Sequence, residues 1–454
     1  MSTHLARLQN ARDPHPVLTE LMEHGRAIRR TVPRSAHAAL ELPADRDPLG
    51  VLAGQDATRL QHLVPLRHER MLQSPFAFYR GTAGIMAADL APGARTGVEV
   101  VSCGDAHLSN FGLFASPQRS LVFDLNDFDE SAPGPWEWDV KRLVTSAVIG
   151  GRDAGHSEEQ VRRAAMASVT AYRMSLRSMM RLDALERYYS RVDTDAPHPH
   201  LDAQGQRVLD RAARQARRRT ARAFVEKVMT TTEDGTPVLV ENPPVLTHVT
   251  TRTEEELEEL FEQYRSTVAP DIAVLVSHFT LTDLAMRVVG VGSVGTRCYI
   301  LILAGPAGEP LVLQVKEAQA SVLQSHGGIA PNPRAGGAHH SEGHRVVACQ
   351  RILQAVSDPF LGHLQVDGRD YYVRQFRDMK GSIDTATLSP KAFRTYSAAC
   401  GMVLARSHAQ SRDAPVVAGY LGRSKEFDRA VVEWALAYAD VSAADYELLR
   451  GAAS

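Results

Sequence analysis

The chain has few cysteines and no long apolar run. Its 454 residues include four cysteines, Cys103, Cys298, Cys349 and Cys400, which lie far apart and form no Cys-x-x-Cys pair. This spacing excludes a disulfide framework and indicates reduced, buried thiols. No apolar stretch approaches the ~20 residues that a membrane-spanning helix needs, and the N-terminal residues are polar. We therefore expect a soluble cytoplasmic protein with no membrane partner.

The chain also lacks a strong net charge. Its formal charge of -2 gives it no overall field that would attract nucleic acid, so such a partner would need a local basic patch. One candidate patch lies on a predicted helix and consists of Arg211, Arg214, Arg217, Arg218, Arg219 and Arg222. Because no aromatic residues alternate with these arginines to stack on bases, a solvated helix face is the favoured interpretation. Nucleic acid is not an expected partner.

Polar residues with catalytic potential gather in the first half of the chain. A predicted strand at 98–102 leads into Cys-Gly-Asp-Ala-His-Leu-Ser-Asn, which places Asp105 five residues before Asn110. Phosphotransferases use an Asp and an Asn at this spacing to orient a hydroxyl and to bind magnesium. The next short strand, 121–123, leads to Asp124. We expect Asp105 to orient the attacking hydroxyl, and Asn110 and Asp124 to bind Mg²⁺.

The same segment leaves alternatives open. Asp127 is a second candidate metal ligand, and Asp129 is a close rival for that position. His107 is a candidate catalytic residue that would orient its neighbours, although a purely structural histidine fits the same pattern. Asp and Asn also form turns and helix caps, so all of these residues could be structural.

A glycine-rich motif occurs in the second half, between two strand-like runs at 286–289 and 298–303. It contains Gly290, Gly292, Ser293 and Gly295, and a third predicted strand, 311–315, leads to Lys316. In a dinucleotide-binding fold such glycines would open a helix, whereas here they enter a strand. Strand, glycine loop, strand and lysine is the order in which kinases cover nucleotide phosphates. A tight hairpin is the alternative interpretation of the glycines.

Lys316 lies within an apolar strand, where an ammonium group needs an anionic partner. The adjacent Glu317 points to the opposite face of the strand. We therefore expect a carboxylate from the helix predicted at 342–357, such as Glu342, to pair with Lys316. Glu342 could instead complement the dipole at the start of that helix.

Asp139 follows Trp136 and Trp138 at the start of a further predicted helix. An acid among apolar residues at this place can accept hydrogen bonds from the backbone of the Asp105 loop behind it. The alternative is an N-terminal helix acid beside core tryptophans.

Several of these segments resemble one bacterial family. The residues at 74–81 (Ser-Pro-Phe-Ala-Phe-Tyr-Arg-Gly), 103–112, 123–130 and 134–142 are similar to the family catalogued as domain of unknown function 2252, as are those at 314–317 and 375–381. More distantly, the segment from Gly104 to Asn110, together with Asp124, resembles the catalytic loop and metal-binding Asp of aminoglycoside phosphotransferases and choline kinases. Those enzymes usually have His where this chain has Cys103.

The second resemblance implies an α+β, protein kinase-like, two-lobed fold. Kinases place the glycine loop and lysine before the catalytic loop, and this chain places them after it, so we expect a circular permutation. The expected parts are an N-terminal arm (1–75), a helical catalytic lobe with the catalytic and metal-binding hairpin (76–240), a β-rich nucleotide-binding lobe (241–385) and C-terminal helices that complete the helical lobe (386–454). Permutation is compatible with a compact domain because chain termini often lie close together.

These expectations combine into one functional hypothesis, an ATP- and Mg²⁺-dependent phosphotransferase that acts on a hydroxyl, most simply that of a small molecule. One alternative is a metal-dependent phosphoester hydrolase that uses Asp105, His107, Asp124 and Asp127 without nucleotide. Another is a catalytically silent nucleotide-binding scaffold protein. The sequence does not name the acceptor.

Overall fold

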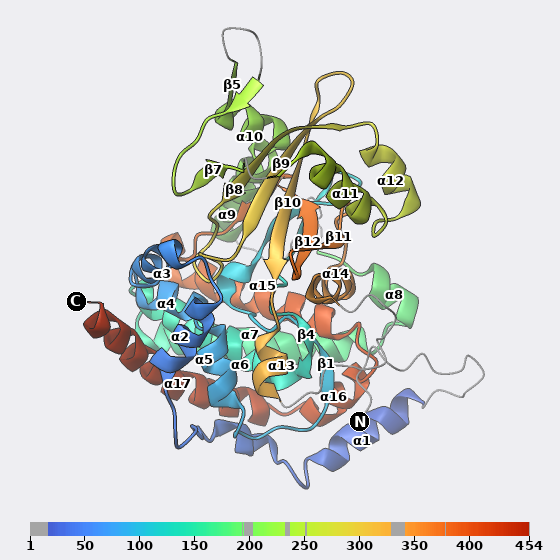
Figure 1. The fold of residues 1–454 in the computed structure, drawn as a ribbon. Helices are drawn as coiled ribbons and strands as arrows, with labels where there is room; N and C mark the ends of the chain where they lie inside the picture. Colours follow the sequence, from blue (N-terminus) through green and yellow to red (C-terminus); the bar gives the residue numbers. More distant parts are fainter. Residues whose placement is uncertain are drawn as a thin grey trace.

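The computed structural model describes residues 17–192, 194, 203–231, 237–249, 252–327, 341–376 and 378–453. The protein has a mixed α+β fold with several separate sheets. In Figure 1 the largest sheet occupies the upper part of the molecule and most of the helices lie below it. Within the described residues, no helix combines the length and the apolar character that crossing a bilayer requires.

Short helices form the N-terminal part of the described chain. Proline occupies one of the first two positions of α2 and α3, where its fixed φ angle suits a helix start and no backbone N–H is needed. These prolines therefore mark the starts of helices. These elements are α1 (Leu18–Ile28), η2 (Arg34–Ala38), α2 (Pro48–Ala57), η3 (Gln61–Leu63), α3 (Val64–Met71), α4 (Pro75–Arg80) and α5 (Ala83–Leu90).

The segment with the first polar motif folds into two small antiparallel sheets. Strand β1 (Glu99–Ser102) pairs with β4 (Ala132–Pro135). Strand β2 (Phe111–Ala115) pairs with β3 (Leu121–Leu125) and, on its other side, with β13 (Gly381–Ser382). Both strands predicted before Asp105 and Asp124 are therefore present. The short helix η4 (Leu108–Asn110) connects the Asp105 loop to β2.

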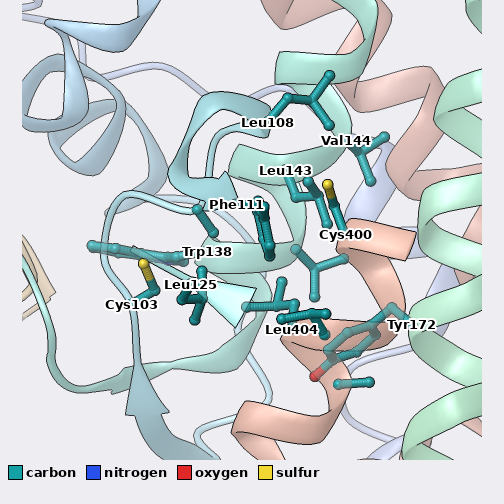
Figure 2. Packing of buried hydrophobic residues seen from close by; sticks show 14 of the residues in the cluster. Cys103, Leu108, Phe111, Leu125, Trp138, Leu143, Val144, Tyr172, Cys400 and Leu404 are labelled. Carbon is teal, nitrogen blue, oxygen red and sulfur yellow. The ribbon is translucent and has the colours of Figure 1, made fainter. Parts of the chain in front are cut away.

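Helices from both ends of the chain share one core. Helix α15 (Pro390–His408) packs along α7 (Glu158–Met179), and both contact α6 (Trp136–Asp153). Figure 2 shows Cys400 and Leu404 of α15 packed near Leu143 of α6 and Phe111 of β2. The C-terminal helices thus complete a core that the first half of the chain begins. At the start of α7, Ser157 and Gln160 form a capping box.

A six-stranded antiparallel sheet forms the second large layer, with strand order β11-β12-β10-β9-β8-β7. One face packs against α10 (Ala221–Val228) and the other against α11 (Glu254–Arg265) and α12 (Pro270–Val276). Helix α14 (Glu342–Leu353) contacts β11 and β12. The strands are β7 (Leu246–His248), β8 (Thr280–Arg287), β9 (Cys298–Ala304), β10 (Pro310–Ala318), β11 (Gly362–Val366) and β12 (Arg369–Gln375).

The remaining elements complete the fold. They are α8 (Ala184–Tyr189), α9 (Ala203–Arg218), β5 (Met229–Thr231), β6 (Pro237–Leu239), α13 (Val322–Gly327), η5 (Thr385–Thr387), α16 (Ala414–Leu421) and α17 (Glu426–Ala452).

Two local predictions need correction. The arginine-rich segment is not one helix, because Thr220 accepts a hydrogen bond from the backbone of Ala223 and starts α10 after α9 has ended. The strand predicted at 286–289 lies earlier in the chain, at β8, so the glycine-rich loop is longer than expected. All four cysteines are free and buried, as predicted.

Candidate functional site

A cavity of about 410 Å³ lies between the first-half hairpin and the six-stranded sheet. Of the predicted residues, the structure brings Asp105, His107, Asn110, Asp127, Gly290, Gly292, Ser293 and Lys316 to its wall. Asp129, the rival metal ligand, also lines it. The predicted residues Asp124, Gly295 and Glu342 do not line this cavity. The cavity is strongly charged; its cationic lining residues are Arg59, Arg80, Arg219, Arg287, Lys316, Arg374 and Lys380.

Lys316, in the second half of the chain, contacts acidic residues of the first half. Its side chain is almost completely buried, and its ammonium group forms an ion pair with Asp129 and donates a hydrogen bond of 2.9 Å to the Ser293 hydroxyl. An oxygen of Asp127 lies 4.0 Å from the same nitrogen. Burial alone would lower the pKa of Lys316, but the two carboxylates raise it above its usual value. The lysine therefore stays charged.

The prediction that Glu342 pairs with Lys316 was wrong. Glu342 forms an ion pair with Arg345, three residues further along the same helix, and does not contact Lys316. Asp129, from the loop after β3, occupies the position beside the lysine. The hydroxyl of Tyr372 donates a hydrogen bond of 2.7 Å to the other oxygen of Asp129, which fixes the orientation of this carboxylate.

The glycine-rich loop connects β8 to β9 above Lys316. Gly290 has a φ of +70°, a backbone conformation that residues with a side chain rarely adopt. A Cβ atom at Gly292 would lie 3.2 Å from the carbonyl oxygen of Arg80, so the loop needs glycine to approach helix α4 this closely. Arg59 and Arg70 donate hydrogen bonds to backbone carbonyls of the loop, at Val294 and Gly290 respectively. These contacts hold the loop over the cavity.

Asp105 lies on the hairpin side of the cavity. One of its oxygens accepts a hydrogen bond of 2.8 Å from the guanidinium of Arg142, which is buried in α6. The other oxygen lies 3.6 Å from Nε2 of His107. Burial lowers the pKa of His107 to about 4, so this histidine is neutral at physiological pH and does not form an ion pair with Asp105 there. The carboxylate remains 22% exposed and open to the cavity.

Asp139 holds the Asp105 loop from behind, as the sequence predicted. Its two carboxylate oxygens accept hydrogen bonds from the backbone N–H groups of Cys103 (2.6 Å) and Gly104 (2.8 Å). Nε2 of His408, in α15, lies 3.0 Å from the same carboxylate, and Tyr172 is hydrogen-bonded to the other ring nitrogen of His408. We call these contacts of Asp139 the backbone latch.

The structure places two of the predicted metal ligands in structural roles. The carboxylate of Asp124 is buried and accepts hydrogen bonds from the backbone of Leu125 and Ala355, outside the cavity. The amide nitrogen of Asn110 donates to the carbonyls of Asp105 and Asp127, and its oxygen accepts from the N–H of Asp127. Asn110 thus ties the Asp105 loop to the acidic loop that follows β3.

Asp127 and Asp129 are the acidic groups that face Lys316. Although enclosure by the protein opposes ionisation of Asp127, the charges of Lys316, Arg374 and Lys380 hold its pKa below the usual range. In the described part of the chain, no group of three or more His, Cys, Asp or Glu side chains lies close enough together to bind a metal ion by itself. A magnesium ion held here by two carboxylates would need further oxygen ligands from a substrate.

Sequence reasoning missed a residue that fixes this acidic loop. The guanidinium of Arg345, in α14, donates hydrogen bonds to the backbone carbonyls of Asp129 and Ser131 in the loop, and to that of Gln319 after β10. Arginine on a helix is usually solvated or half of a surface ion pair, so its sequence context carries no signal for this role.

We expect Lys380 to give the cavity a charge that depends on pH. Its side chain keeps contact with solvent, but enclosure by protein and repulsion from Arg374 lower its pKa to about 7, against the opposing attraction of Asp127. Its charged form therefore predominates below about pH 7 and is lost above it. Sulfate keeps its charge through this range. We expect sulfate affinity, measured by calorimetry, to fall by up to roughly tenfold between about pH 6 and about pH 8. The Lys380→Met variant should show no such fall; an equal fall in the variant would contradict the assignment.

The fold and this cavity define an α+β protein with a charged pocket built from both halves of the chain. The chain matches, over residues 59–452, the family described as an uncharacterised protein conserved in bacteria (DUF2252), and it belongs to that family. Comparisons with curated proteins and with solved structures give no match.

Proposed function

We propose that this protein is an ATP- and Mg²⁺-dependent phosphotransferase with a hydroxyl compound as acceptor. One observation carries the proposal: Lys316, beneath a glycine-rich loop, lies beside Asp127 and Asp129 in the cavity that Asp105 also lines. A lysine, a glycine loop, metal-binding acids and an acid that can orient a hydroxyl are the parts that phosphoryl transfer requires.

Each part has a role that fits its surroundings. The glycine-rich loop and Lys316 would bind the phosphates of ATP, with Arg80 and Arg374 adding positive charge to the same wall. Asp127 and Asp129 would hold Mg²⁺, whose remaining ligands would be phosphate oxygens and water. The ion would neutralise phosphate charge. The exposed oxygen of Asp105 would accept a hydrogen bond from the acceptor hydroxyl and orient it.

The contacts at the end of α15 support the permuted, kinase-like arrangement. In kinase order a helix precedes the catalytic loop, and here α15 ends at His408, beside the strand that leads to Asp105. The backbone N–H of Val101, in β1, donates a hydrogen bond of 2.8 Å to the Ser411 hydroxyl just after α15. The Tyr396 hydroxyl bonds to the carbonyls of Leu108 and Phe111. These contacts put the end of α15 next to the catalytic loop, the spatial neighbourhood that a kinase-like arrangement requires.

A hydrolase that used metal alone is less well supported. Such enzymes rely on several protein ligands for their metal ions, and among the described residues no three-ligand cluster is present. The buried position of Asp124 removes one ligand that this alternative requires.

Calorimetric titration of ATP into the purified protein, with and without Mg²⁺, tests the proposal. We expect Mg²⁺-dependent binding that weakens at least about tenfold in the Asp127→Asn and Lys316→Met variants, because each loses a charged contact with the bound complex. Lys227→Met, a change at an exposed lysine on α10, is the matched control and should bind as the unchanged protein does. Failure of the unchanged protein to bind ATP would overturn the proposal.

A further inference from the structure

A second cavity, of about 310 Å³, lies on the opposite face of the six-stranded sheet. Side chains alternate along β10, so Lys316 faces the charged cavity while Leu313 and Val315 face the second one. Its roof is α11, from which Leu257 and Phe261 reach toward the strands. The two cavities are therefore separated by the thickness of one sheet.

The part of this cavity between α11 and the sheet is lined mainly by apolar side chains. Leu301 and Tyr299 of β9, and Leu257, Leu260 and Phe261 of α11, all keep partly exposed side chains although they lie between a helix and a sheet. Helix α11 thus covers this region without filling it. Its size and apolar lining are typical of small-molecule sites.

Three arginines and the carboxylates that pair with them lie at the edge of the same cavity. Arg252, Arg297 and Arg369 belong to its lining. Arg252 pairs with Asp367 and Glu256, whereas Arg297 and Arg369 share a single carboxylate, that of Glu317, at 3.2 and 3.7 Å. At the Glu317 end of this edge, two guanidinium groups on one carboxylate leave a local positive charge that an anionic ligand could balance.

We propose that this cavity binds a single-chain amphiphile of the fatty-acid type. Its hydrocarbon chain would lie between α11 and the sheet, where it would remove apolar protein surface from water. Its carboxylate would bind at Arg297 and Arg369. The residues that would contact the hydrocarbon do not line the charged cavity, so this part of the proposal does not depend on ATP binding. Glu317, which pairs with the head-group arginines, does line that cavity.

Fluorescence titration with cis-parinarate, a naturally fluorescent fatty acid, tests the proposal on the full chain. We expect saturable binding of one molecule per protein, weakened at least about tenfold by Leu301→Trp, which fills the cavity. Val274→Trp, at an exposed position of α12 outside the cavity, is the matched control and should not change the affinity. If Leu301→Trp does not fold, Leu257→Trp fills the same space from the helix.

The head-group assignment has its own test. Arg369→Gln should weaken binding of cis-parinarate about fivefold or more, and the uncharged methyl ester should bind the unchanged protein as weakly as the acid binds this variant. Equal affinity for acid and ester would overturn the anionic part of the proposal. Absence of saturable binding, or binding only to vesicles of anionic phospholipid, would overturn the site itself.

Discussion

Replacing Asp105 with asparagine should reduce phosphoryl transfer by about 10²–10⁴-fold, the range typical of a lost acid–base group. Asparagine keeps the shape of the side chain but cannot take the proton of an acceptor hydroxyl. ATP affinity should stay close to that of the unchanged protein, because Asp105 is not among the residues that would contact the nucleotide. The measurement is the rate of ADP release in the presence of Mg²⁺, first with water as acceptor and then with choline, sugars and an aminoglycoside.

Asp153→Asn, at the far end of α6, provides the comparison. This aspartate contacts Ser74 at the surface and lies outside the cavity, so ADP release should not change. An Asp105→Asn variant as active as the unchanged protein would exclude the proposed role of Asp105. Unchanged ATP affinity with no ADP release, even from the unchanged protein, would instead favour the scaffold alternative.

Replacing Asp139 with alanine should lower the free energy of unfolding by about 3–5 kcal/mol, the cost of breaking a buried charged interaction. The variant removes the acceptor for the backbone N–H groups of Cys103 and Gly104 and leaves His408 without its carboxylate partner. None of these groups can reach water in exchange, because Asp139 and His408 are both buried. Denaturant unfolding followed by circular dichroism gives the difference.

An Asp→Ala change elsewhere on α6 shows how much of the destabilisation comes from the backbone latch and how much from the change in helix propensity. Asp153→Ala removes one exposed hydrogen bond and should change the free energy of unfolding by no more than about 1 kcal/mol. Equal destabilisation by the two variants would show that the latch contributes nothing of its own.

The sequence predicted the strands and loops of the candidate site better than the directions of its side chains. Local patterns were sufficient for the strands before Asp105 and Asp124, and an acid just after two tryptophans was sufficient for the backbone latch. The direction of Asp124 was not predictable, because β3 is buried along its whole length and shows no alternation that would separate its two faces.

The sequence also could not predict contacts between segments that lie far apart along the chain. Lys316 and Asp129 are 187 positions apart, and no local pattern reports which loop meets which strand. Glu342 was a reasonable partner by composition, yet Arg345 on its own helix satisfies it. The break between α9 and α10 was missed because Thr220, which starts the second helix, lies within a run of arginines that suggests one continuous helix.

The union of early and late segments in one core has a consequence for the synthesis of this protein. Val101, Leu108 and Asp139 in the first third of the chain make their hydrogen bonds with Ser411, Tyr396 and His408. On the ribosome the early segment therefore emerges long before its partners exist. The loop that carries Asp105 has its contacts with Asp139 and Arg142 early, but it acquires the contacts with Tyr396, His408 and Ser411 only when the last helices have left the exit tunnel. The nascent chain therefore has no complete site until then.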